Sequence, residues 1–173
     1  MKRIICLIMF IALCQIVVNG EVRKNWCGGI NAEISFAITG AAGEFDYKSI
    51  GVAGGYGLLL NDHYFVGLGV KPNYIFSDDD FNGFFLPIYG EFKYKSSLTD
   101  KYLGGYGVVR AGYSPTGQGG AYAHIGGGLL YKKWEFGLGI SYQNATFKET
   151  WDKDVWYCDY NIVFATLSVG YYF

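Results

Sequence analysis

The chain has 173 residues and is rich in glycine and aromatic residues, with 26 Gly, 16 Tyr and 13 Phe against 3 Pro. Its formal net charge is only −1, and charged residues make up 17% of it, so it lacks the basic surplus typical of nucleic-acid-binding proteins. Many aromatic residues and glycines with few charged residues favour an all-β protein.

The N-terminus has the three regions of a secretory signal peptide. Met1-Lys2-Arg3 is basic, an apolar run extends from Ile4 to Val18, and a small-residue step follows at Val18-Asn19-Gly20. The apolar run is shorter than the roughly twenty residues of a membrane-spanning helix, which disfavours an N-terminal anchor. We therefore predict a signal peptide at 1–20 and one mature domain at 21–173.

Eight segments of the mature part alternate apolar residues with polar or small ones, which is the period-two pattern of β-strands. Each is about ten residues long or slightly longer, enough for a tilted strand that crosses a bilayer. The even number suits the closure of an antiparallel barrel. The segments are 29–38, 50–60, 64–76, 84–95, 102–113, 120–131, 134–143 and 160–173.

The connections between these segments alternate in length. Those after the first, third, fifth and seventh segments are generally longer than those after the second, fourth and sixth. Short periplasmic turns and larger external loops are typical of membrane barrels, which would place both mature termini in the periplasm. The external loops would be 39–49, 77–83, 114–119 and 144–159.

Alternation does not by itself say which face of a barrel is outward, because a soluble ligand-carrying barrel puts its apolar residues inside. Here the polar series consists mostly of Gly, Ser, Asn and Tyr, which suits a narrow interior better than a hydrated surface. It carries three acids and three bases, which balance and are expected to form structural ion pairs in the lumen. These six residues are Glu33, Lys71, Glu91, Lys93, Arg110 and Glu135.

Tyr and Trp residues of the apolar series gather near the ends of the segments, as in the aromatic girdles at the two membrane–water interfaces. Tyrosine is also a common strand residue, so this placement supports a membrane barrel without deciding it. The residues are Tyr64, Tyr74, Tyr94, Tyr113, Tyr131, Trp134, Tyr142 and Tyr171.

The last segment has an uninterrupted apolar series that ends on Phe173. Val169, Tyr171 and Phe173 resemble the C-terminal assembly signal of bacterial outer-membrane barrels, with an aromatic last residue and another two before it. Segments 87–94 and 120–131 also resemble those of outer-membrane β-barrel domain proteins, the small porin-like and OmpX/OmpA-like barrels. The resemblance implies an eight-stranded antiparallel up-and-down transmembrane β-barrel, surrounded by outer-membrane lipid and inserted by the barrel assembly machinery. It implies no particular activity.

A lipid A-modifying enzyme is an alternative, because some small outer-membrane barrels act on lipid A. The deacylase pattern places a serine two residues after the histidine, whereas Gly126 stands at that position after His124. We therefore expect His124 to be a hydrogen-bonding residue of the lumen. The acidic run Asp78-Asp79-Asp80 lacks the spaced ligands and the glycine of an EF-hand loop, so we predict no metal site and no cofactor.

Two cysteines, Cys27 and Cys158, belong to the mature part. Cysteines of an exported protein can pair, but the strand assignment places these two at opposite ends of the barrel. The sequence therefore predicts two free thiols.

The segment 144–159 combines Phe147, Trp151, Trp156 and Tyr157 with charged residues. It either presents aromatic anchors to an extracellular partner or prolongs the two neighbouring strands above the membrane. We predict a non-enzymatic integral protein of the outer membrane, with a structural or surface-interaction role through its external loops. The alternative is a small porin-like channel, although side chains can fill the interior of an eight-stranded barrel.

Overall fold

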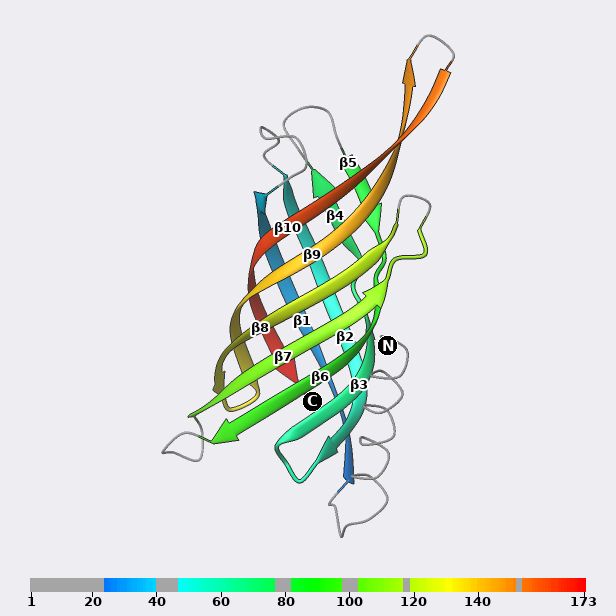
Figure 1. The fold of residues 1–173 in the computed structure, drawn as a ribbon. Helices are drawn as coiled ribbons and strands as arrows, with labels where there is room; N and C mark the ends of the chain where they lie inside the picture. The colour runs from blue at the N-terminus through cyan, green and yellow to red at the C-terminus, as the bar shows by residue number, and fades with distance from the viewer. Residues whose placement is uncertain (1–23, 40–46, 77–81, 98–102, 117–118, 152–153) are drawn as a thin grey trace, which may run out of the picture.

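The computed structural model describes residues 24–39, 47–76, 82–97, 103–116, 119–151 and 154–173. The predicted signal peptide at 1–20 and the acidic run at 78–80 lie outside these residues. Within them, no helix is long and apolar enough to cross a membrane. The regular structure consists of β1 (Lys24–Thr39), β2 (Lys48–Leu60), β3 (Tyr64–Val70), β4 (Asn73–Phe76), β5 (Asn82–Phe85), β6 (Ile88–Ser97), β7 (Leu103–Tyr113), β8 (Ala121–Tyr131), β9 (Trp134–Trp151) and β10 (Asp154–Tyr172) (Figure 1).

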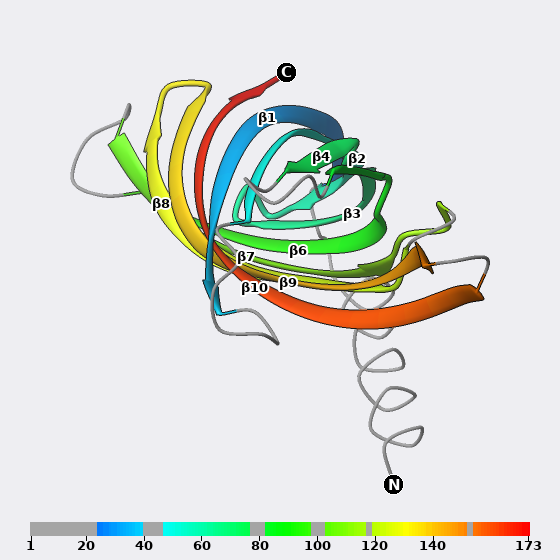
Figure 2. The ribbon, with the colours of Figure 1, turned by 90° about the horizontal axis from the view of Figure 1, so that it is seen from above.

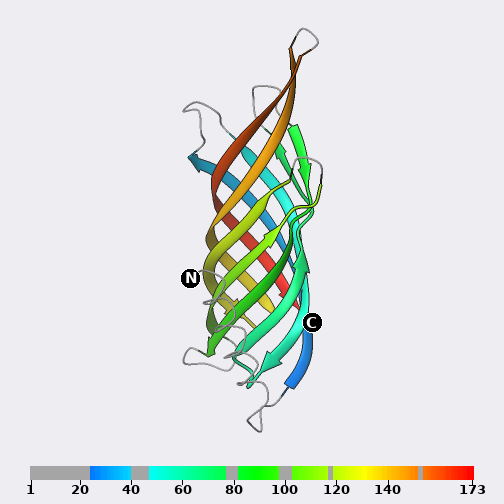
Figure 3. The same cartoon turned by 45° about the vertical axis from the view of Figure 1, so that its right-hand side comes forward.

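The strands form one closed antiparallel sheet, in which β1 pairs with β2 on one side and with β10 on the other. Seen from above, the C-terminal end of β10 runs beside β1, where the sheet closes (Figure 2). The other strands follow in chain order and are tilted against the long axis of the barrel (Figure 3). The predicted all-β, up-and-down fold is therefore confirmed.

Two of the eight barrel strands are interrupted in the middle. β3 and β4 are halves of one strand separated by Lys71 and Pro72, and β5 and β6 are halves of the next, separated by Leu86 and Pro87. Proline has no N–H to donate to the sheet, so each strand is interrupted at its proline. The proline carbonyls still take part, because the Val52 N–H donates to Pro72 O at 3.1 Å.

Tight turns join strands at one end of the barrel. Asn61 and Asp62 between β2 and β3 have φ of 51° and 61°, and Lys132 between β8 and β9 has φ of 57°. Such left-handed conformations match the right-handed twist of the strands that a tight hairpin joins, and asparagine and aspartate tolerate them well. These turns stand where the sequence predicts short connections.

The described residues of the segment 144–159 belong to strands and not to a loop, which corrects the predicted end of the seventh strand. β9 and β10 remain paired from Asn144↔Asn161 to Trp151↔Asp154, well beyond the last pairs with their other neighbours, Tyr122↔Gln143 and Thr39↔Val163. The resulting hairpin projects from one end of the barrel (Figure 1). The alternative prediction, that this segment prolongs the strands, is confirmed, and its Thr, Val and aromatic residues are good strand formers.

The apolar residues of the barrel point outward and the polar ones inward. Leu68 and Leu138 are 72% and 67% exposed, whereas Glu33 and Lys93 are 2% and 1% exposed. A soluble barrel would have the opposite distribution, because water would face its outer surface. The distribution is that of a transmembrane barrel, whose outer surface faces lipid.

Candidate functional site: the filled lumen

Arg110 on β7 is buried in the lumen between two carboxylates from other strands. Its Nη1 is 2.5 Å from Oε1 of Glu33 on β1, and its Nε is 2.6 Å from Oε2 of Glu91 on β6. All three residues are buried. A guanidinium is well suited to this place because it offers several donors in fixed directions and stays charged.

Three more charges extend this group in both directions. Lys71 Nζ lies 2.6 Å from Oε2 of Glu33, while Lys93 Nζ lies 3.4 Å from Oε1 of Glu91 and 2.8 Å from Oε2 of Glu135. The six residues singled out by sequence thus form one chain of alternating sign, which we call the lumen ion network. Each charge has at least one opposite partner, as burial of ions requires.

Tyrosine rings lie against every cation of the network. The Arg110 guanidinium is 5.3 Å from the ring centre of Tyr89, and Lys71 Nζ is 5.5 Å from that of Tyr122. Lys93 Nζ is 4.8 Å from the ring centre of Tyr172. Cation–π contacts of this kind add to the ion pairs when both partners are shielded from water.

A second chain of side-chain hydrogen bonds also lies in the lumen. His124 Nδ1 is 2.8 Å from Ser141 Oγ, which is 2.9 Å from Thr166 Oγ1, which in turn is 3.0 Å from Ser35 Oγ. These residues come from β8, β9, β10 and β1, so the chain links four neighbouring strands. His124 is therefore a hydrogen-bonding residue of the lumen. Its partner Ser141 lies on the neighbouring strand, 17 residues away in sequence. The residues next to His124 in sequence therefore do not predict this pair.

An apolar cluster fills the lumen nearer to the projecting hairpin. It joins five buried residues from β10, β4, β5 and the position just before β2, and the sequence analysis does not predict them as lumen residues. The members are Tyr47, Ile75, Phe85, Ile162 and Phe164. On these stretches both faces of the strand are apolar, so the period-two contrast that reveals inward positions is lost.

The predicted girdle residues form two bands on the outer surface. At the end with the tight turns, Tyr64 packs against Tyr94 and Trp134 against Tyr171, each with ring centres 5.3 Å apart. Tyr131 pairs with Trp134 in the same band. The other predicted girdle residues, Tyr74, Tyr113 and Tyr142, lie toward the opposite ends of their barrel strands and form the other band.

The three residues of the predicted assembly signal lie on the outer face at the closing seam. Val169 pairs with Ala32 of β1 and Tyr171 with Ile30, and all three side chains are exposed. The backbone of Phe173 exchanges two hydrogen bonds with Gly28, at 3.1 and 3.2 Å. These hydrogen bonds therefore join the end of the last strand to the first strand.

Cys27 and Cys158 lie far apart. Cys27 is a free thiol, and its backbone pairs with Gly57 near the tight turn after β2. The backbone of Cys158 pairs with Phe147 on the projecting hairpin. Among the described residues, no group of three His, Cys, Asp or Glu is placed to hold a metal ion.

Comparisons with known proteins find similarity among solved structures. No family model matches the chain, and no curated protein matches it. Among solved structures, the chain is similar to the crystal structure of the N-terminal β-barrel domain of Pseudomonas aeruginosa OprF. The sequence identity is 15%, the match covers 87% of this chain and 100% of that one, and the TM-score is 0.49. The assignment of the fold rests on the strand pairings described above.

Proposed function

We propose that this chain is a non-enzymatic integral protein of a bacterial outer membrane, which stabilises the envelope and meets a partner through the projecting β9–β10 hairpin. The observation that carries the proposal is a closed barrel with an apolar exterior and a lumen filled by paired charges. In lipid, a closed barrel is the only sheet that satisfies all its backbone hydrogen bonds. The signal peptide at 1–20 would supply the route of export.

The filled lumen supports a structural role over a channel. A pore needs a continuous aqueous path, but the lumen ion network and the cluster around Phe85 and Phe164 occupy the interior at two levels. The same filling leaves His124 and Ser141 buried, with their side chains engaged in links between strands. A catalytic pair instead needs a position beside it for a substrate.

The hairpin reverses the polarity of the barrel, which supports its position outside the bilayer. The register positions that continue the lipid-facing series turn polar, while those that continue the lumen-facing series become largely apolar and aromatic. The first series is Asn144, Thr146, Lys148, Thr150, Val155, Tyr157, Asp159 and Asn161. The second is Ala145, Phe147, Glu149, Trp151, Asp154, Trp156, Cys158 and Tyr160.

The hairpin also has two strand edges that continue past their neighbours in the described structure. Such edges can accept a further strand, with main-chain hydrogen bonds giving affinity and alternate side chains giving specificity. An extended segment of a surface protein, rather than a small molecule, is the partner that this shape fits.

The test is to fractionate cells and compare boiled with unboiled protein on a denaturing gel. We expect the mature protein, 21–173, in the outer-membrane fraction, and we expect its unboiled band to migrate differently because all backbone hydrogen bonds of a closed barrel are satisfied within the sheet. Recovery of the protein in the soluble periplasm, without a heat-dependent shift in migration, would contradict the proposal.

We further propose that Val169, Tyr171 and Phe173 are read by the barrel assembly machinery. Phe173→Asp should lower the heat-shifted fraction in cells, while the purified variant refolds in detergent as the wild type does. Tyr113→Asp, an equally exposed aromatic position on β7, is the matched control and should insert normally. If the wild type and both variants insert equally well, these three residues are not an assembly signal.

A further inference from the structure

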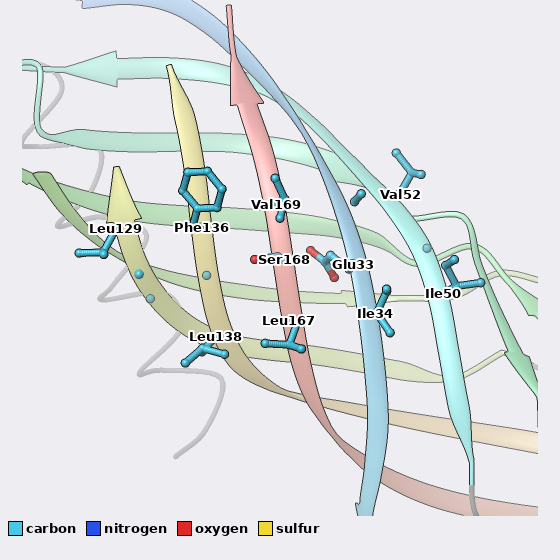
Figure 4. Close-up of a pocket in the computed structure, with 15 residues that line it drawn as sticks. Glu33, Ile34, Ile50, Val52, Leu129, Phe136, Leu138, Leu167, Ser168 and Val169 are labelled. Carbon is cyan, nitrogen blue, oxygen red and sulfur yellow. The ribbon is translucent and has the colours of Figure 1, made fainter. Parts of the chain in front are cut away.

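An apolar hollow lies on the outer face of the barrel. It has a volume of about 700 Å³ and extends over β8, β9, β10, β1 and β2 (Figure 4). Ala32 and Gly127 line it and leave space, because they are small residues at outward positions opposite larger ones: Ala32 pairs with Val169, and Gly127 pairs with Leu138. Its size lies in the range of ligand pockets, about 300–1,000 Å³.

At one end of this hollow, aromatic residues are followed by basic residues. Two residues beyond Leu129 and Phe136, the strands carry Tyr131 and Trp134, and the next residues form the turn Lys132-Lys133. The Lys133 ammonium lies 5.9 Å from the ring centre of Tyr171, and that of Lys132 lies 5.5 Å from the ring centre of Tyr131. Both lysines are exposed.

The lysines, the aromatic rings and the hollow follow one another along the barrel in the order in which a phospholipid carries its headgroup, its interfacial part and its acyl chains. At about 3.3 Å per residue, Lys133 stands roughly 10 Å along β9 from Phe136, so charge, aromatic rings and hollow follow one another at membrane depth. An apolar hollow alone accepts any acyl chain. The paired lysines add a preference for a negative headgroup, because basic residues near a bilayer attract anionic lipid.

We infer that this face binds one anionic phospholipid of the periplasmic leaflet, with its phosphate at Lys132-Lys133 and an acyl chain in the hollow. The inference rests on the proposed membrane location. The left-handed turn at Lys132, with φ of 57°, keeps the two lysines next to the aromatic band. Trp134 and Tyr171 pack edge to face and provide the interfacial platform between the charge and the apolar surface.

Binding is measured by native mass spectrometry on the mature protein, 21–173, refolded in detergent. The probes are phosphatidylglycerol and phosphatidylethanolamine with identical acyl chains. Wild type should bind one phosphatidylglycerol in preference to phosphatidylethanolamine. K132Q/K133Q should weaken phosphatidylglycerol binding about fivefold for each lysine and leave phosphatidylethanolamine unchanged.

Variants in the hollow separate the acyl chain from the headgroup. Ala32→Phe fills the hollow and should weaken the binding of both lipids, whereas Ala111→Phe, at an exposed position on β7 outside the hollow, should weaken neither. The heat-dependent gel shift is recorded for each variant, so failure of the barrel itself is distinguished from failure of lipid binding. Equal binding of both lipids by the wild type, or an unchanged preference in K132Q/K133Q, overturns the site. If Ala32→Phe binds both lipids with unchanged affinity, the acyl chain does not lie in the hollow.

Discussion

Arg110→Met is expected to destabilise the folded barrel by about 3–5 kcal/mol, the usual cost of removing one partner from a buried ion pair. Arg110 is the bridge between Glu33 and Glu91, so its loss divides the lumen ion network and leaves one more acid than base inside. Methionine has similar length and keeps the space filled, which isolates the effect of charge. Urea unfolding in lipid vesicles, followed by the fluorescence of the tryptophans, measures the loss.

The matched control is the double variant R110M/E91Q. It restores balance, because Glu33 keeps Lys71 and Lys93 keeps Glu135. We therefore expect it to recover most of the stability lost in R110M, although it removes one more charge. If the two variants are equally unstable, the contribution of Arg110 lies in its packing against Tyr89 and not in its ion pairs.

The barrel follows from periodicity because the lipid-facing series must be apolar without a break. A period of two is therefore visible on each of the eight strands, and the short connection at 61–63 stands where predicted. The same reasoning failed at 144–159. Past Gln143, the register positions that continue the outward series are polar, as at Thr146 and Lys148, and loss of an apolar series predicts the end of a strand. Strand pairing does not depend on that series and continues to Trp151.

The sequence predicts the types and charges of the residues that fill the lumen, but not which of them contact one another. The balance of three acids and three bases indicates mutual pairing, but the partners depend on how the barrel closes. Glu33 and Arg110 are 77 residues apart and meet across the interior, and His124 meets Ser141 only through the register of β8 with β9. The apolar cluster with Ile75 and Phe85 was missed because its strands lack polar contrast.

Leu138→Arg is expected to destabilise the barrel in vesicles by about 2–4 kcal/mol, the cost of a basic residue at the bilayer midplane of a transmembrane barrel. Leu138 is 67% exposed and lies midway along the outward series of β9, between Trp134 and Tyr142. On a soluble barrel the same substitution would place a charge in water and change stability by less than about 0.5 kcal/mol. The variant therefore reports the medium around this face.

Tyr131→Arg is the matched control, since this position is also exposed and outward but belongs to the aromatic band at the end of β8. The cost of arginine falls to about 0–1 kcal/mol near the interface, where the side chain can reach water and lipid phosphate. A steep difference between the two positions is thus expected in vesicles. Equal and small effects at both would mean that water surrounds the outer face, and the membrane assignment would then be wrong.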